Sequence, residues 1–257
     1  MFKKIMLVTA AMLLVFAVLC LCGASAEDIK TITLADGASQ SNADGVVCDG
    51  DVVRIMRAGE YLVSGTLTNG QISVECENNA KVKLYLNGVN LHNVNGPAII
   101  VASGIGRVSI SLVSMTENTL SNGDRLVFSA GDNEPNGVIF SRSDLTITGE
   151  GNLTVIAGAM DGIVSKDDLR IKGGVISVTA PRHGIRGKDY VEISTATITV
   201  KAGQDGLRTT ADDREDRGYI SVVDSTLELY CGDDPFSYVT RLTTSNSSIT
   251  CVPTEED

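Results

Sequence analysis

The chain has 257 residues, with 32 Asp and Glu against 21 Lys and Arg, so its formal net charge at pH 7 is −11. This acidic balance disfavours nucleic acid as a partner, because binding to phosphates requires a basic surface, and it favours cations or ligands bridged by cations. The length exceeds that of an ordinary single core and suits one elongated all-β domain.

The first 26 residues carry the features of an export signal. Lys3 and Lys4 precede an apolar run from Ile5 to Cys22, and Ala24-Ser25-Ala26 matches an A-x-A cleavage site. The pattern predicts a secretory signal peptide over residues 1–26. An uncleaved anchor helix is the alternative, because the apolar run approaches a spanning length. Cleavage leaves a mature chain with a charge of 19 − 32 = −13, which we expect to be secreted or held at the cell surface, with no further membrane segment.

Residues 27–257 are predicted to form one domain, in which residues 27–49 cap the first turn of the fold. Between residues 50 and 135 apolar and polar residues alternate as in strands, although the segments vary in length. The mature chain keeps four cysteines, for which spacing alone allows three pairings: Cys48, Cys76, Cys231 and Cys251. The last two fall on apolar strand positions, where a buried small hydrophobic residue is the simpler interpretation.

The C-terminal half repeats with a period of 22 residues in its clearest copies, which start at Asp161-Gly-Ile163, His183-Gly-Ile185 and Asp205-Gly-Leu207. Further copies are assigned at Asn95-Gly-Pro97, Asn136-Gly-Val138 and Asp234-Pro-Phe236. Apolar residues recur in columns, of which the first is Leu145, Leu169, Val191, Ile220 and Leu242. Strand periodicity, turn residues between the segments and a period of about 22 residues predict a right-handed parallel β-helix. Its rungs would stack about 4.8 Å apart.

Several stretches resemble the clostridial-type carbohydrate-binding β-helix family, whose members look like polysaccharide lyases: AGEYLVSGTLTNGQISVE, VKLYLNGVNL, DNEPNGVIFSRSDLTITGEGNLTV, DGIVSKDDLRIKGGVISVTA and HGIRGKD. The resemblance covers roughly residues 30–250. It implies an exported, calcium-binding, pectate-lyase-like β-helix that binds plant polysaccharides, with cellulose and acidic sugars among them, and it does not establish a catalytic activity. The chain departs from the repeated DGI turn at His183 and at Asp234-Pro-Phe236, which puts in doubt any calcium site that uses those positions.

The repeat predicts that Asp161, His183 and Asp205 lie one above another. Stacked carboxylates about 5 Å apart repel each other, and either a hard cation such as Ca²⁺ or an interrupting residue such as His183 relieves the repulsion. The candidate calcium ligands are Asp161, Asp167, Asp168, Asp189, Asp205, Asp212 and Asp213. The opposing interpretation is that Asp-Gly forms metal-free turns and that the other acids are solvated; the family resemblance favours calcium.

Basic residues recur in the same rungs, where Arg186 and Arg208 share one repeat position and Lys166 and Lys188 another. Such a strip suits the carboxylates of a uronic acid polymer, which Arg can bind in a bidentate manner; the alternative is charge balance against neighbouring aspartates. The predicted ligand-binding residues are Lys166, Arg186, Lys188, Arg208 and His183. The chain has no Trp and 4% aromatic residues, so acidic glycans are favoured over cellulose.

These features predict a secreted, monomeric, calcium-dependent carbohydrate-binding protein more readily than an enzyme. A calcium-dependent pectate-type lyase is the first alternative, in which an Arg or Lys beside the metal removes a proton; the sequence assigns no such base. An adhesin or spacer on the cell surface is the second.

Overall fold

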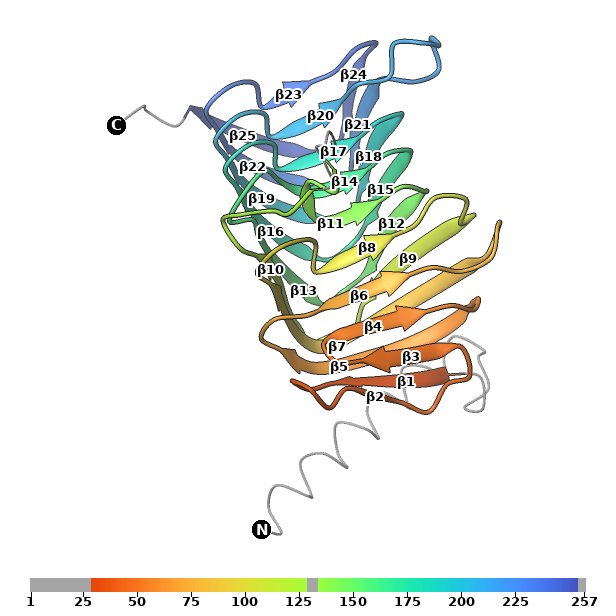
Figure 1. Ribbon diagram of the computed structural model, residues 1–257. Helices are drawn as coiled ribbons and strands as arrows, with labels where there is room; N and C mark the ends of the chain where they lie inside the picture. The colour runs from red at the N-terminus through yellow and green to blue at the C-terminus, as the bar shows by residue number, and fades with distance from the viewer. Residues whose placement is uncertain (1–28, 129–133, 254–257) are drawn as a thin grey trace.

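Short strands follow one another along residues 29–128 and 134–253, the part of the chain that the computed structural model describes (Figure 1). From β8 onwards each turn of the chain adds one strand to each of three parallel ladders, which wind upward from the N-terminal end in Figure 1. The predicted all-β parallel β-helix is therefore confirmed. The predicted signal peptide, residues 1–26, lies outside the described residues.

Three ladders make up the solenoid. The first ladder contains β9 (Arg107–Leu112), β12 (Leu145–Gly149), β15 (Asp168–Lys172), β18 (Tyr190–Ser194), β21 (Tyr219–Val223) and β24 (Leu242–Ser245). The second contains β10 (Glu117–Asn122), β13 (Asn152–Ile156), β16 (Val175–Ala180), β19 (Thr197–Ala202), β22 (Thr226–Cys231) and β25 (Ser248–Pro253). The third contains β4 (Val52–Ile55), β6 (Gln71–Val74), β8 (Ile99–Val101), β11 (Gly137–Ser141), β14 (Asp161–Ser165), β17 (Ile185–Gly187), β20 (Leu207–Thr209) and β23 (Phe236–Ser237).

The N-terminal end is less regular. The long strand β7 (Lys81–Asn93) pairs with both β9 and β10 and so joins the first two ladders, and β5 (Gly59–Leu67) pairs with β7. Beyond β5 lies β1 (Ile29–Leu34), which pairs with β2 (Gln40–Ser41) in an antiparallel manner, while β3 (Val46–Asp49) pairs antiparallel with β4. No helix within the described residues is long and apolar enough to cross a membrane.

The predicted apolar columns form the core. Leu145, Leu169, Val191 and Ile220 are adjacent across the first ladder and have no exposed surface. Burying these columns against those of the other ladders is the main stabilising contribution, since one rung cannot cover its own apolar face. Leu242, at the last rung, stays half-buried.

Two of the assigned repeat copies are out of register. Asp161 pairs with Gly137 rather than with Asn136, a slip of one residue, because Ile139 and not Val138 lies opposite Ile163. Ile139 in turn pairs with Ile99, so Ile99 and not Pro97 is aligned with Ile163, a slip of two residues. Apolar residues that face the core set the pairing, and the turn residues follow.

The repeated turn requires glycine for a steric reason. A Cβ atom on Gly162 would lie 2.6 Å from the carbonyl oxygen of Gly184, and one on Gly184 would lie 2.8 Å from that of Gly206. The backbones of successive turns therefore pack too closely for any side chain at this position.

All four described cysteines are free thiols. Cys231 is buried in the core, as expected. Cys251 is exposed, contrary to expectation, because no described rung stacks beyond β25.

Candidate functional site

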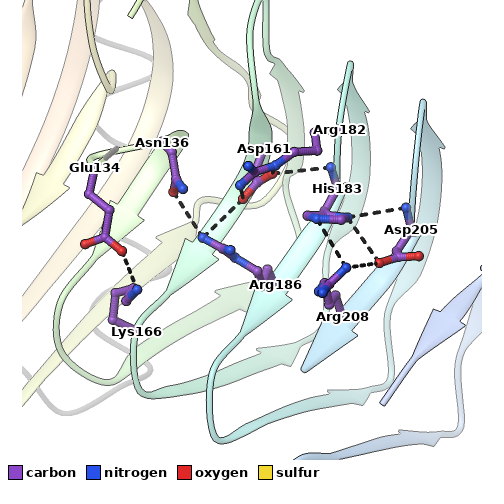
Figure 2. A network of polar contacts seen from close by, with 9 residues as sticks. All are labelled: Glu134, Asn136, Asp161, Lys166, Arg182, His183, Arg186, Asp205 and Arg208. Atoms are coloured by element: carbon purple, nitrogen blue, oxygen red, sulfur yellow. Dashed lines mark hydrogen bonds and ion pairs between the residues drawn. The ribbon is translucent and has the colours of Figure 1, made fainter. Parts of the chain in front are cut away.

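A stack of polar side chains stands where the strands of the third ladder begin (Figure 2). Ile163, Ile185 and Leu207 are paired across β14, β17 and β20, so the residues two positions earlier, Asp161, His183 and Asp205, lie one above another as predicted. All three are buried. Their spacing is that of adjacent strands, about 4.8 Å, so two buried carboxylates here require compensation.

Arginine compensates Asp161. Arg182 donates from Nε to Oδ1 at 2.6 Å and from an Nη atom to Oδ2 at 2.9 Å, and Arg186 lies 3.2 Å from Oδ2. Arg186 also donates to the Asn136 side-chain oxygen at 3.1 Å. Hydrogen bonding to Asp161 raises the pKa of Arg182, whereas burial lowers the pKa of Arg186 from its ordinary value. Both Asp161 oxygens are thus occupied by guanidinium groups.

His183 links the two carboxylates of the stack. Its backbone N–H donates to Asp161 at 3.3 Å, and its ring Nδ1 lies 3.2 Å from Asp205 Oδ2. Arg208 donates to the same Asp205 oxygen at 2.7 Å and lies 3.5 Å from His183 Nε2. Burial lowers the pKa of His183, so the neutral ring is favoured. A ring that donates Nδ1–H to Asp205 Oδ2 and accepts at Nε2 from Arg208 satisfies these two contacts, whereas the longer contact of the Asp205 backbone N–H to Nδ1, at 3.4 Å, requires the other tautomer.

Lysine extends this network along the third ladder. Lys166 forms an ion pair with Glu134, which lies 3.9 Å from Arg142. Lys188 is exposed and forms no ion pair with a described residue. The structure therefore brings together four of the five predicted ligand-binding residues: Lys166, His183, Arg186 and Arg208. We call these four residues and Arg182 the arginine strip. The fifth predicted residue, Lys188, lies beside the strip at the surface.

A second group of acids lies at the turns that lead into the first ladder. Asp144, Asp167 and Asp168 each place a carboxylate oxygen within 4.8 Å of the others. Burial, the neighbouring charge of Asp144 and a contact with Asp189 raise the pKa of Asp167 to about 6. Asp189 is only 4% exposed, and its Oδ1 atom has no hydrogen-bond partner among the described residues. We call these four residues the acidic cluster.

Two arginines partly neutralise the acidic cluster. Arg170 lies 3.0 Å from Asp168 and Arg217 lies 3.1 Å from Asp189. Asp144 and Asp167 form no ion pair with a described residue, and Arg170 and Arg217 also pair with Glu192 and Asp213 outside the cluster, so the carboxylates of the cluster outnumber their guanidinium partners. A buried oxygen without a donor among the described residues and an excess of carboxylates over guanidinium partners fit a divalent, oxygen-seeking cation such as Ca²⁺.

The seven predicted calcium ligands do not form one site. Asp167, Asp168 and Asp189 converge, whereas Asp161 and Asp205 are enclosed by arginine in the stack. Asp212 and Asp213 are exposed in the loop between β20 and β21, and Asp213 pairs with Arg217 at 3.3 Å.

The sequence did not single out Asp144. The available signal was its place one residue before Leu145 in the first apolar column, the same place that Asp168 takes before Leu169.

The acidic cluster and the arginine strip are contiguous. Lys166 and Asp167 are consecutive residues, one in each group, and Lys188 and Asp189 repeat the arrangement one rung later. Each turn between the third and first ladders thus places a lysine beside the arginine strip and a carboxylate in the acidic cluster.

The aromatic residues nearby are not free to stack on a sugar. Tyr190 and Tyr219 stack on each other with centroids 4.9 Å apart. Arg170 lies over the Tyr190 ring at 4.7 Å and Arg241 over the Tyr219 ring at 4.3 Å. Each ring therefore has a guanidinium on one face and the other ring on the opposite face, so neither ring has a free face for stacking on a sugar.

Comparisons with known proteins agree with the fold. A family model described as carbohydrate-binding domain-containing protein matches residues 49–257. A protein of that description from Acetivibrio thermocellus is 39% identical over 230 residues, which are 88% of this chain and 80% of the relative. A solved structure described as the polysaccharide lyase-like protein from C. thermocellum, a gadolinium derivative, superposes with a TM-score of 0.77 at 30% identity, covering 88% of this chain and 95% of that one.

Proposed function

Because the chain belongs to the family of carbohydrate-binding domain-containing proteins, we propose that it is a secreted protein that binds acidic, uronate-bearing polysaccharide of plant cell walls in a calcium-dependent manner. One observation carries the proposal: an acidic cluster whose carboxylates outnumber their guanidinium partners, and whose buried Asp189 Oδ1 has no hydrogen-bond partner among the described residues, lies beside a strip of arginine and lysine. A ligand that carries carboxylates can contact the arginine strip and the cation of the acidic cluster at the same time.

The acidic cluster would hold the cation through Asp144, Asp167, Asp168 and Asp189. Calcium prefers several carboxylate oxygens and accepts irregular geometry, which suits four aspartates from three successive turns. Bound calcium would supply the positive charge that binds a carboxylate of the sugar. The solved relative is described as a gadolinium derivative, and gadolinium, like calcium, is a hard cation that seeks oxygen ligands.

The arginine strip would supply the direct contacts to the polymer. Arg208 and Lys166 are each more than a third exposed at the side chain, and Lys188 is exposed beside them. Guanidinium groups bind carboxylates in a planar, bidentate manner. An anionic chain is attracted to this strip although the whole protein is acidic, because the surrounding negative charge is screened within about 10 Å at ordinary salt.

The test is calorimetric titration of the chain from residue 27 with polygalacturonate, with and without Ca²⁺. We expect binding that requires Ca²⁺ in the unaltered protein and is lost in Asp189→Asn. Asp212→Asn, an exposed acid of the neighbouring loop, should bind as the unaltered protein does. Binding that is equal with Ca²⁺ and with a chelator would exclude the calcium-dependent function, and binding of cellulose alone would exclude the acidic ligand.

A lyase is the second candidate, and the buried arginine favours it. Arg186 is 16% exposed at the side chain, and burial lowers its pKa, which is the direction that a proton-abstracting base requires. Ultraviolet absorbance of unsaturated products in the same mixture separates the candidates. Rising absorbance that disappears in Arg186→Lys, while polymer binding persists, would establish an enzyme; flat absorbance with calcium-dependent binding would establish a binding protein.

A further inference from the structure

A second positive region lies at the N-terminal end of the first ladder, away from the arginine strip. A surface hollow of about 360 Å³ is lined there by Lys81, Lys83 and Arg107, together with Glu60 and Ser109. Lys81 and Lys83 come from β7, Arg107 and Ser109 from β9, and Glu60 from β5. We call Lys81, Lys83 and Arg107 the basic hollow.

The positive charges of the basic hollow are available to a ligand. None of its three side chains forms an ion pair with a described residue, and Lys81 and Arg107 are exposed. The Glu60 carboxylate instead accepts a hydrogen bond from the Tyr85 hydroxyl at 2.5 Å, and the Lys83 ammonium lies 4.4 Å from the centre of the Tyr85 ring. Tyr85 thus contacts both the one acid of the hollow and Lys83, so the hollow presents three positive charges against one negative charge.

The basic hollow is in line with the acidic cluster. Lys81 pairs with Arg107 across β7 and β9. Val108 pairs with Leu145 across β9 and β12, so Arg107 and Asp144, the residues before that pair, are neighbours on adjacent strands. Leu145 pairs with Leu169, which places Asp168 next in the row. One row along the solenoid axis therefore reads Lys81, Arg107, Asp144, Asp168, with a step of about 4.8 Å.

We propose that the basic hollow is a second anion subsite, which takes carboxylates of the same acidic polysaccharide at sugar residues beyond the one held at the acidic cluster. The inference rests on the proposed function. A pyranose chain that runs along the solenoid axis advances by a length similar to one strand spacing per residue, so successive uronates meet the acidic cluster with its cation first and the basic hollow next. The Ser109 hydroxyl can donate to the same carboxylate. Recognition along this row depends on chain length.

The test compares a short and a long oligogalacturonate, both in Ca²⁺, by calorimetry. In Lys81→Ala/Arg107→Ala we expect affinity for the long oligomer to fall about 10-fold or more, since the variant removes two charge-assisted contacts to the sugar carboxylates. Affinity for the short oligomer should stay unchanged. Lys201→Ala is the matched control, because Lys201 is an exposed strand lysine that lies over Tyr230 at 5.8 Å, on the second ladder.

The outcomes separate this inference from the proposed function. If the unaltered protein binds neither oligomer, the proposed function fails. If it binds both and the double variant keeps its affinity for the long one, the subsite is wrong and the proposed function stands. An equal loss for short and long oligomers would also overturn the subsite, because it would show a general effect of surface charge. Both substituted residues are exposed, and an unchanged melting temperature confirms that the variant is folded.

Discussion

Removal of the Asp161 carboxylate is the sharpest test of how the turn stack is stabilised. Asp161 has no exposed surface, and its two oxygens receive Arg182 at 2.6 and 2.9 Å and Arg186 at 3.2 Å. In Asp161→Asn two guanidinium groups remain side by side without their counter-charge, and Arg186 is nearly buried. Breaking a buried ion pair by removing one partner costs about 3–5 kcal/mol. Arg182, which is 27% exposed, can turn to water, so we expect the lower end, about 3 kcal/mol.

Denaturant unfolding of the chain from residue 27 measures this change, with the free energy of unfolding extrapolated to water. Asp216→Asn is the matched control, because Asp216 holds Arg214 through two bonds of 2.9 and 2.5 Å with both side chains exposed. We expect no measurable change there, since exposed pairs contribute little. A loss below about 1 kcal/mol in Asp161→Asn would refute the argument that arginine is what makes this buried carboxylate tolerable.

Three further predictions concern the cluster, the histidine and the turn. Ca²⁺ at about 100 times its dissociation constant should stabilise the unaltered protein by about 2.7 kcal/mol and leave Asp189→Asn unaffected; equal melting temperatures in Ca²⁺ and in chelator would contradict the site. The pKa of His183 is lowered from 6.5, so the unfolded chain takes up the proton first. The contribution of His183 to the free energy of unfolding is thus complete above pH 6.5 and is lost as pH falls through the folded-state pKa. His183→Gln should flatten the dependence of the free energy of unfolding on pH in this range. An unchanged slope would count against a neutral ring. Gly184→Ala should cost about 1–3 kcal/mol, because its Cβ would lie 2.8 Å from the Gly206 carbonyl oxygen, whereas Gly96→Ala, with no atom closer than 3.5 Å, should be tolerated in the same unfolding assay.

The regular half of the fold was predictable because the spacing of its inward-facing residues determines the strand register. Leu145, Leu169 and Val191 recur at nearly constant spacing and each must face the core, so the sequence fixes their alignment across strands. The earlier rungs have irregular turns. There Asn136-Gly-Val138 was aligned with Asp161-Gly-Ile163 by the similarity of the turn residues. The strand pairing instead places Ile139 opposite Ile163, although Val138 is buried as well, so the turn residues alone do not give the register.

The site was predictable only where it follows the repeat. The stack of Asp161, His183 and Asp205 follows from the register alone. The arginine partners do not, because Arg182 and Arg186 reach Asp161 across rungs with side chains whose direction depends on packing. Asp144 has no Asp-Gly turn to mark it, and only the three-dimensional neighbourhood shows that it joins Asp167 and Asp168.

The two groups of acids differ in how far the protein neutralises them, and this difference decides where an external cation has most effect. In the stack, guanidinium groups and a histidine stand between and beside Asp161 and Asp205, so a further positive ion would have to displace arginine. In the acidic cluster, the carboxylates outnumber Arg170 and Arg217, and burial together with repulsion from Asp144 raises the pKa of Asp167. Under the proposed function, one divalent ion would supply the missing positive charge there. The histidine at position 183 fits this division, because a neutral ring adds no charge between Asp161 and Asp205, which arginine already neutralises, whereas the cluster one turn away keeps an excess of carboxylates.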